Sequence, residues 1–405
     1  MNISRGKIAT LAIGLLLIGG IVFGARYMAF FDQKLPNGEV RTVDKAIDSV
    51  TPSQSEKREV KPENVPIEVE AVATGLEVPW TIAFTSDTRI LVTERPGRLR
   101  VIENGKLLPK SLHTFSVSSE DEEGLMGLAV DPEYETNHFI YVSYAVPSNG
   151  ALKVRVERFT DNGDNLSGSK VILDNIPAAK FHAGSALKFG PDGKLYITTG
   201  DATDKNIAQD KGNLGGKILR LNADGSIPTD NPLSGSPVWS YGHRNPQGIA
   251  WHPVTQELYE TEHGPSVFDG PAGGDEVNHI MKGENYGWPL VSHEKKRAGT
   301  VAPLLVFTPA EAPASATFYA SDTIPQFTNR FFFGALKGEG IIKVLFDEKN
   351  PDRVVSYEKL SEVKLGRIRD VIEGPDGSLY FTTSNRDGRG KAASSDDRVM
   401  RIRAK

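Results

Sequence analysis

The sequence of 405 residues contains no cysteine. Disulfide bonds, zinc sites built on thiolates, thiol nucleophiles and lipid attachment to a cysteine are therefore excluded. Helical patterns are also scarce in the C-terminal four-fifths of the chain, because its many glycines and prolines interrupt nearly every window long enough for a 3.6-residue period. These absences favour an all-β protein that folds without disulfides.

The sequence also lacks a strong excess of one charge. Its net charge is −5, and lysine and arginine are scattered along the chain. A nucleic-acid surface requires clustered basic residues, so we expect no nucleic-acid partner. The length would allow two average domains, but closed β domains reach this size as one unit.

The N-terminus holds the longest apolar run, which covers residues 8–24 and follows Arg5 and Lys7. This run is near the shortest length that spans a bilayer, so residues 1–32 are predicted to be a signal peptide or signal anchor. The basic residues before it place the N-terminus in the cytoplasm and the rest of the chain outside. Cleavage after VFGA at residues 22–25 stays open, and an uncleaved anchor is preferred. We expect an extracytoplasmic protein that is membrane-anchored or secreted.

Residues 33–65 are rich in Lys, Glu, Pro and Ser and are predicted to be a flexible linker. The folded domain is predicted to cover residues 66–405. Within it, a turn containing Asp, Pro, Gly or Asn is repeatedly followed by a short run of aromatic and β-branched residues. The six copies occupy residues 85–94, 131–145, 190–201, 252–264, 329–340 and 374–385.

One such copy per four-stranded blade predicts a six-bladed β-propeller. Residues 396–403 are expected to complete a blade begun elsewhere in the sequence. An all-β sandwich with unrelated hairpins is the alternative, although six units of blade length are difficult to place in two sheets.

Two motifs provide groups that can hold an anionic, oxidised molecule beside a hard metal ion. YGHRNPQG at residues 241–248 supplies a cation and an amide, and TEHGP at residues 261–265 supplies consecutive backbone carbonyls. Three further cations lie in late, strand-bordering segments: Lys337, Arg367 and Arg369. Together these residues indicate a ligand that carries several negative charges.

His182 precedes an apolar strand and is followed by the small residues Ala183 and Gly184. An imidazole accepts a proton near neutral pH, and small neighbours leave room for a substrate. Taken alone, a histidine at such a position is more often a structural hydrogen-bonding group. In a propeller, however, loops from different blades meet at one mouth of the channel, so His182 can approach the cations.

The sequence resembles the soluble pyrroloquinoline quinone (PQQ) dehydrogenases of glucose, aldose sugars and sorbosone. The resemblance runs from about Gly75 to Ile402 and is most specific in the combination of GHRNPQG, EHGP and ENYGWP. It implies a propeller with PQQ and Ca²⁺ as cofactors. It also implies an aldose substrate that is oxidised at its anomeric carbon to a lactone, with the electrons passed to an external acceptor.

The resemblance implies a role for individual residues. His182 matches the general base, Arg244 and Asn245 match contacts to the quinone oxygens, and Gly264 and Pro265 match the carbonyls that bind the cofactor's calcium. Three cations match positions that bind the cofactor carboxylates: Lys337, Arg367 and Arg369. Three residues complete the set: Glu123, which replaces a glutamine of the best-known relative, and Glu276 and the Tyr286 carbonyl, which match a second, structural calcium site.

Each of these sites has a structural alternative. Arg244 could form an ion pair in a plain turn, and EHGP could be an ordinary turn. Arg367 and Arg369 could pair with Asp370 or Glu373, Lys337 could belong to an ordinary hairpin, and residues 273–280 could be a solvated acidic loop.

Two other functions stay open for the whole domain. One is a non-catalytic propeller that binds a carbohydrate or protein partner. The other is a metal-dependent lactonase, which needs carboxylate and asparagine ligands that converge on the channel, where this chain is expected to place arginine and lysine. The sequence indicates neither the particular sugar nor an oligomeric state.

Overall fold

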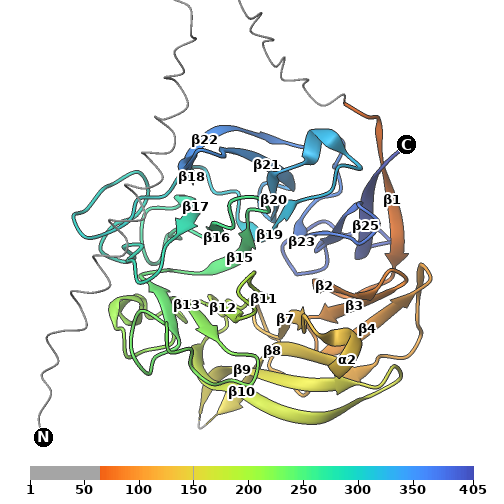
Figure 1. Ribbon diagram of the computed structural model, residues 1–405, viewed down its shortest axis with the longest axis horizontal. Coiled ribbons are helices and arrows are strands. Elements are labelled where there is room, and N and C mark those ends of the chain that lie inside the picture. The colour runs from red at the N-terminus through yellow and green to blue at the C-terminus, as the bar shows by residue number, and fades with distance from the viewer. Residues whose placement is uncertain (1–63, 149) are drawn as a thin grey trace, which may run out of the picture. The chain divides into compact units, whose positions relative to one another are not determined.

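The computed structural model describes residues 64–148 and 150–405. These residues form six antiparallel sheets that radiate from a central axis (Figure 1). The predicted six-bladed β-propeller is therefore confirmed. The predicted signal segment, residues 1–32, and nearly all of the predicted linker lie outside the described residues. Val65, at the end of that linker, exchanges hydrogen bonds between its backbone and the side chain of Gln326.

The blades are numbered here in chain order. Blade 1 contains β2 (Pro79–Ser86), β3 (Arg89–Glu94), β4 (Arg98–Glu103), β5 (Lys106–Leu107) and β6 (His113–Thr114). Blade 2 contains β7 (Leu125–Val130), β8 (Phe139–Ser148), β9 (Ala151–Asp161) and β10 (Leu166–Ala178). Blade 3 contains β11 (Leu187–Phe189), β12 (Leu195–Thr199), β13 (Lys217–Leu221) and β14 (Val238–Tyr241).

The second half of the ring has the same order. Blade 4 contains β15 (Pro246–Trp251), β16 (Leu258–Glu262), β17 (Asp275–Ile280) and β18 (Leu305–Phe307). Blade 5 contains β19 (Pro313–Tyr319), β20 (Arg330–Ala335), β21 (Gly340–Asp347) and β22 (Asn350–Lys359). Blade 6 contains β23 (Ile368–Glu373), β24 (Leu379–Thr383), β25 (Arg398–Ala404) and β1 (Ile67–Thr74).

Helices are short throughout the described part of the chain: α2 (Tyr134–Asn137), η1 (Lys205–Gln209) and η2 (Pro325–Phe327). Among these residues, no helix has the length and apolar character needed to cross a membrane.

Each of the six sequence repeats contains all or most of the second strand of one blade, and most also contain the turn before it. For example, GPDG at residues 190–193 connects β11 to β12, and the matching GPDG at residues 374–377 connects β23 to β24. The repeat was detectable because tight turns require Gly, Asp and Pro, whereas the buried second strand requires β-branched and aromatic side chains.

The two ends of the domain meet in blade 6, where β1 pairs antiparallel with β25 (Figure 1). As predicted, residues 396–403 belong to a blade that begins elsewhere in the sequence: the N-terminal strand β1 is the outermost strand of blade 6, and β25 is the third. The pairing of Ile67 with Ala404 and of Thr74 with Arg398 closes the ring by hydrogen bonds between the chain ends.

The core is divided among the interfaces between neighbouring blades. Buried apolar residues of the described chain fall into six clusters, one in each interface. The interface between blades 4 and 5 is the most aromatic and contains Tyr259, Phe318 and Phe346. Because side chains alternate between the two faces of a strand, each sheet can contribute to the interfaces on both of its sides.

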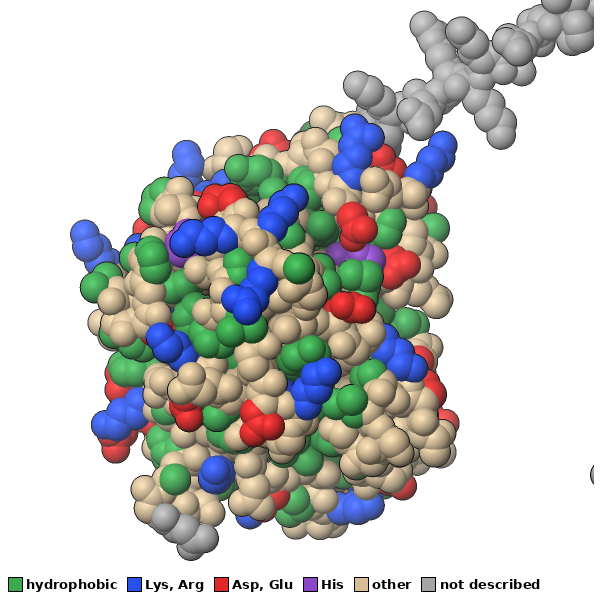
Figure 2. Space-filling model, turned by 90° about the vertical axis from the view of Figure 1, so that its left-hand side faces the viewer, with side chains coloured by type: hydrophobic (Ala, Val, Ile, Leu, Met, Phe, Trp, Pro, Cys, Tyr) green, Lys and Arg blue, Asp and Glu red, His purple; other side chains and the backbone are tan. Residues whose placement is uncertain are grey.

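In this topology two kinds of loop lie at the same end of the channel. One kind connects the outermost strand of a blade to the innermost strand of the next blade, and the other connects the second and third strands within a blade. Residues that are distant in sequence therefore meet there. On the face of the molecule seen in Figure 2, basic and acidic side chains are interspersed, as expected from their scattered positions in the sequence.

Candidate active site

A cavity of about 640 Å³ lies at this end of the channel. Seven of the predicted site residues line it: His182, Arg244, Gly264, Pro265, Lys337, Arg367 and Arg369. They come from the connections that lead into β11, β15 and β23, from β23 itself, and from the β16–β17 and β20–β21 loops. The convergence expected from the propeller topology is therefore present in the structure.

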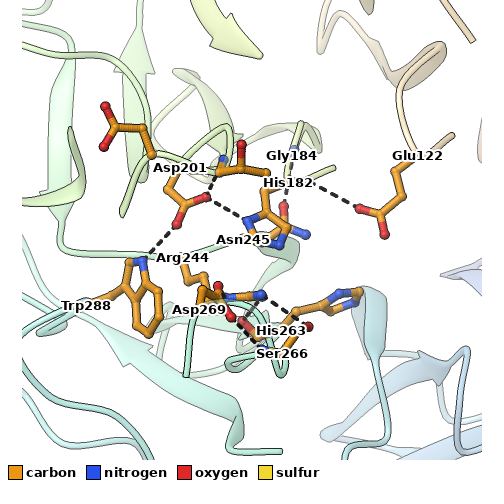
Figure 3. A network of polar contacts seen from close by, with 12 residues as sticks. Glu122, His182, Gly184, Asp201, Arg244, Asn245, His263, Ser266, Asp269 and Trp288 are labelled. Atoms are coloured by element: carbon orange, nitrogen blue, oxygen red, sulfur yellow. Dashed lines mark hydrogen bonds and ion pairs between the residues drawn. The ribbon is translucent and has the colours of Figure 1, made fainter. Parts of the chain in front are cut away.

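His182 is held by a carboxylate on one edge of its imidazole ring. Its Nδ1 lies 2.7 Å from Oδ1 of Asp201, and the other oxygen of Asp201 accepts a hydrogen bond of 2.8 Å from Nε1 of Trp288 (Figure 3). Asp201 is 1% exposed, so this hydrogen bond is shielded from water. An ionised carboxylate only accepts hydrogen bonds, so the proton lies on Nδ1 and the Nε2 lone pair is free to act as a base.

The backbone of His182 is also constrained. Its φ is +56°, a left-handed conformation that is uncommon for a residue with a side chain. The His182 N–H donates to Oε2 of Glu122 at 3.2 Å, and its carbonyl accepts from the Ala202 N–H at 3.3 Å. Such conformations are retained where surrounding contacts fix them, and they are enriched at functional sites.

Arg244 crosses the cavity wall beneath the β16–β17 loop. Its Nε donates to Oδ2 of Asp269 at 2.8 Å, and its Nη1 donates to the His263 carbonyl at 3.2 Å (Figure 3). The ion pair proposed as a structural alternative for Arg244 is thus present. Arg244 is also part of the cavity lining although it is only 3% exposed, so the two interpretations do not exclude each other.

Three side chains form the floor of the cavity. The guanidinium carbon of Arg369 lies 3.8 Å from the centre of the Trp80 ring, and Nη1 of Arg369 donates to Oε1 of Gln247 at 3.0 Å. All three residues also line a second cavity of about 440 Å³ on the other side, so they separate the two ends of the channel. Burial lowers the pKa of Arg369 to about 9.

Arg369 forms no ion pair with a carboxylate in the described part of the chain. The alternative pairing with Asp370 or Glu373 is therefore not present. Its Nε is buried and makes no hydrogen bond. A buried cation with an unused donor is costly unless a ligand satisfies it. Arg369 therefore fits the role of holding an anionic group in the cavity.

Arg367 and Lys337 stand at the neighbouring wall. Nη2 of Arg367 lies 2.7 Å from Oδ2 of Asp387, and its Nη1 donates to the Leu336 carbonyl. Arg367 thus pairs with Asp387 and not with Asp370 or Glu373. Lys337 lies in the turn between β20 and β21, is exposed to the cavity and has no ion pair within the described residues.

Five lysine and arginine side chains line the cavity: the four cations described above and Arg389. Two of them, Lys337 and Arg369, have no acidic partner in the described chain. PQQ is a flat molecule with three carboxylates, and this excess of positive charge is suited to such a ligand. The residues present therefore fit the cofactor.

Gly264 and Pro265 follow β16 and present consecutive peptide groups at the cavity. The Gly264 N–H donates to Oδ1 of Asp275 at 2.8 Å, which fixes the orientation of this segment. The Pro265 carbonyl accepts one hydrogen bond, from the Gly273 N–H at 3.2 Å. A carbonyl oxygen has two lone pairs, so both residues retain acceptor capacity for a hard cation such as calcium.

Glu276 and Tyr286 lie outside the large cavity. Together with Glu262 they line a separate cavity of about 10 Å³, which is close to the space that one water molecule or ion needs. Residues 273–280 do not form a solvated acidic loop, because most of them belong to the buried strand β17.

The carboxylates beside this small cavity are crowded. Nδ2 of Asn278 donates to Glu260, Glu262 and Glu276 at 3.0, 3.3 and 3.2 Å. Burial, together with the charge of Glu262, raises the pKa of both Glu260 and Glu276 well above the ordinary value. The group therefore requires either bound protons or a cation.

Glu123 does not reach the cavity, contrary to the sequence prediction. Its side chain is completely buried and accepts from the Ser118 hydroxyl and from the N–H groups of Glu120 and Asp121. The preceding residue, Glu122, lines the cavity instead and forms an ion pair of 2.8 Å with Arg389. The prediction was displaced by one residue: in the bend before β7, adjacent side chains have different surroundings, and Glu122 is the one in the cavity lining.

Asn245 lies behind the cavity wall. Its Oδ1 accepts from the Gly184 N–H at 3.3 Å and from Nε2 of Gln247 at 3.0 Å, and its Nδ2 is buried without a partner. Figure 3 places its side chain next to His182. Asn245 supports the residues around His182, and its free Nδ2 is the atom with capacity for another hydrogen bond.

Several residues of the site were not predicted from the sequence, among them Asp201, Trp288 and Phe268. A signal for Asp201 existed in the repeat. The copies GPDGKLYITTGD and GPDGSLYFTTSN match closely, yet they end in Asp201 and Asn385, respectively. Asp201 carries a charge where the matching residue Asn385 does not. A charged side chain just after a buried strand indicates a candidate functional residue.

Known proteins with similar sequences and folds were found for most of the domain. Residues 76–392 match the family model described as Glucose / Sorbosone dehydrogenase. The chain is 34% identical to an aldose sugar dehydrogenase of Escherichia coli K12, over 80% of this chain and 91% of that protein. It is 36% identical to an uncharacterised protein of Synechocystis, over 78% of this chain and 84% of that protein.

The solved structures agree with this assignment. A PQQ-bound aldose sugar dehydrogenase from Streptomyces coelicolor superposes with a TM-score of 0.74 and 30% identity, and it covers 84% of this chain and 99% of that one. An apo-form soluble aldose sugar dehydrogenase from E. coli gives a TM-score of 0.73 and 30% identity, over 84% of this chain and 100% of that one. The chain is therefore an oxidoreductase of the glucose/sorbosone dehydrogenase family.

Proposed function

We propose that this protein oxidises aldose sugars at the anomeric carbon to lactones, using PQQ and Ca²⁺, with His182 as the general base. One observation carries the proposal: an imidazole oriented by a buried carboxylate opens onto a cavity with two unpaired cations. The first feature suits proton abstraction from a hydroxyl group, and the second suits an anionic redox cofactor.

The proton step is assigned to the pair His182 and Asp201. Because Nδ1 of His182 faces Asp201, Nε2 is the atom that accepts the proton of the sugar's anomeric hydroxyl. The buried carboxylate of Asp201 then stabilises the positive charge that develops on the imidazole. Its own bonds to Trp288 Nε1 and to the Thr203 N–H keep it from rotating away.

Four cations would hold the cofactor. Arg369, Arg367 and Lys337 stand where they would bind its carboxylates, and Arg244 would donate to its quinone oxygens. When bound, PQQ supplies the two-electron acceptor for the hydride that leaves the anomeric carbon. Arg244 forms a salt bridge with Asp269, and Arg367 forms one with Asp387. Both salt bridges would orient the guanidinium groups before the cofactor binds.

Two sets of residues would hold calcium. The carbonyls of Gly264 and Pro265 would bind an ion inside the large cavity, where a hard cation polarises a quinone carbonyl. Glu276 and the Tyr286 carbonyl, with Glu262 beside them, would bind a structural ion in the cavity of about 10 Å³. The second ion would neutralise the crowded carboxylates around Asn278.

We also propose that the protein is exported and works outside the cytoplasm. Residues 1–32 would direct export and anchor the domain or be removed, residues 33–65 would tether it, and an external acceptor outside the cytoplasm would take the electrons from the reduced cofactor. The names of the relatives support the choice of substrate and cofactor: one from E. coli is an aldose sugar dehydrogenase, and one from Streptomyces coelicolor was solved with PQQ bound.

Reconstitution tests this proposal. The purified domain is mixed with PQQ and Ca²⁺, supplied with a panel of aldoses and an artificial electron acceptor, and assayed for dye reduction and lactone formation. We expect dye reduction and lactone formation only when cofactor, calcium and sugar are all present. A holoprotein that binds PQQ but oxidises no aldose would reject the proposal and favour a non-catalytic binding propeller.

A further inference from the structure

The loop between β16 and β17 carries two of the most exposed apolar side chains in the described part of the protein. Val267 is 89% exposed and Phe268 is 65% exposed, and both line the large cavity. The remaining wall of this cavity combines charged side chains with apolar ones such as Trp80, Phe181 and Leu336, and Val267 and Phe268 are the most exposed of its large apolar residues. Large exposed apolar groups inside a cavity are typical of a surface that a ligand covers.

The loop has a defined conformation because its backbone is tied at both sides of Phe268. The Ser266 N–H donates to Oδ1 of Asp269 at 2.7 Å, and the Asp269 and Gly270 N–H groups donate to the Ser266 carbonyl at 3.0 and 2.9 Å. Arg244 holds the other oxygen of Asp269 at 2.8 Å. Phe268 therefore occupies the tip of a turn that is fixed to a predicted cofactor-binding residue.

Phe268 also contacts the proposed base directly. Its ring lies 5.7 Å from the imidazole of His182, measured between ring centres, and the two planes differ by 25°. Stacking on the face of the imidazole leaves the Nε2 lone pair free, because that lone pair points outward in the plane of the ring. A molecule bound at Nε2 would therefore lie close to the phenyl ring.

A sugar in its pyranose form suits this arrangement. Its ring carbons present C–H groups that are polarised by neighbouring oxygens, and the negative face of an aromatic ring attracts such groups. We propose that Phe268 is the apolar wall of the sugar subsite and determines affinity for pyranose rings by packing against their C–H groups while the anomeric hydroxyl reaches His182. This inference rests on the proposed function and extends it to substrate recognition.

The test compares Phe268→Ala with Phe268→Tyr in the holoprotein. We expect Phe268→Ala to raise KM for glucose about tenfold, the order expected for loss of one aromatic contact, with a much smaller change in kcat. Phe268→Tyr retains the ring and should keep KM within about twofold of the wild type. Tyr357→Ala, which removes an aromatic side chain of 55% exposure on β22, serves as the control outside the cavity.

A second measurement separates this inference from the proposed function. 1,5-Anhydroglucitol has the pyranose ring but no anomeric hydroxyl, so it cannot be oxidised, and its dissociation constant is measured by calorimetry. We expect Phe268→Ala to weaken its binding by the same factor as KM, while the affinity for PQQ is unchanged. Unchanged KM and dissociation constant in Phe268→Ala, or tighter binding, would overturn the inference even if the wild type oxidises aldoses. Binding that depends on Phe268 in a protein without activity would retain the subsite and reject only the proposed reaction.

Discussion

Nδ1 of His182 lies 2.7 Å from Oδ1 of Asp201; His182 precedes β11 and Asp201 follows β12, so both residues lie at the same end of this antiparallel strand pair of blade 3. Asp201 in turn accepts a hydrogen bond from Trp288, which follows β17 of the next blade. The orientation of the proposed base is therefore set by contacts between two blades, and it does not depend on the local sequence around His182 alone.

Replacement of Asp201 by asparagine tests this positioning role. An amide can turn its NH₂ group toward Nδ1, which would shift the imidazole proton to Nε2 and remove the basic lone pair from the substrate side. We expect Asp201→Asn to lower kcat by about two to four orders of magnitude, with unchanged PQQ affinity.

Trp288→Phe provides a graded comparison, because it removes only the hydrogen bond to the second carboxylate oxygen. Its loss in kcat should be clearly smaller than that of Asp201→Asn. Stopped-flow turnover and absorbance titration with PQQ measure the two quantities. Equal turnover in Asp201→Asn and the wild type would show that the carboxylate has no part in orienting the base.

Arg369→Ala should weaken PQQ binding, by about 1.5 to 3 kcal/mol for the loss of a charged hydrogen bond. Arg369 gives a cleaner result than Arg367 because it has no acidic partner, whereas Arg367→Ala would leave the buried Asp387 carboxylate unpaired and destabilise the fold. Arg353→Ala, at an exposed ion pair with Asp347, is the matched control. Titration of apoprotein by absorbance checks this, and unchanged affinity in Arg369→Ala would assign the arginine a structural role.

Much of the fold was predictable because the turn and second strand of each blade are specified locally. Gly, Asp and Pro form the turn, and the following residues enter a buried strand, so GPDGKLYITT at residues 190–199 carries its own structural signal. The outermost strand of blade 6 was not predictable in this way. β1 pairs with β25 across more than 300 residues of sequence, and no local pattern specifies which strand occupies that edge.

The site was predictable where a motif supplied the residue and unpredictable where a tertiary contact did. His182, Arg244 and Arg369 were found through their motifs, and all three line the cavity. Arg389 and Phe268 lie in loops that resemble no repeat, so their place in the cavity depends on how those loops fold. The prediction named Glu123 where the structure has Glu122 for the same reason. Two adjacent glutamates cannot be distinguished from the sequence, because only the folded structure shows the direction of each side chain.

The carboxylates around Asn278 predict a link between pH, calcium and stability. Burial and neighbouring negative charge raise the pKa of Glu260 and Glu276 in the folded state. The stability gained from their bound protons is fully present below the ordinary glutamate pKa of about 4.3 and is lost as pH rises through the folded-state values. The calcium-free domain should therefore melt at a lower temperature at about pH 8 than at about pH 5.

Calcium should offset that loss most strongly at the higher pH, because the ion replaces the missing protons. Thermal unfolding with and without Ca²⁺ measures this. Glu276→Gln removes one carboxylate from the small cavity and should reduce both the pH dependence and the part of the calcium effect that belongs to this site. Identical melting curves for Glu276→Gln and the wild type under all these conditions would contradict a second calcium site there.

Truncation tests the closure of the ring. A chain that begins at Asn64 keeps β1 and should be soluble and folded. A chain that begins at Gly75 lacks β1, uncovers the hydrogen-bonding edge of β25 and loses the buried Ala73. We expect the shorter chain to melt at a lower temperature and to aggregate, because an exposed edge strand pairs with other molecules. Equal melting temperatures for the two chains would show that β1 contributes nothing to closure.

The most direct test of the account compares His182→Gln with the wild type after reconstitution with PQQ and Ca²⁺. Glutamine can retain a hydrogen bond near Asp201 but cannot accept a proton near neutral pH. We predict that His182→Gln binds PQQ with unchanged affinity and loses about two to four orders of magnitude in kcat for aldoses, the usual contribution of a positioned acid-base group. A His182→Gln holoprotein that oxidises aldoses as fast as the wild type would contradict it.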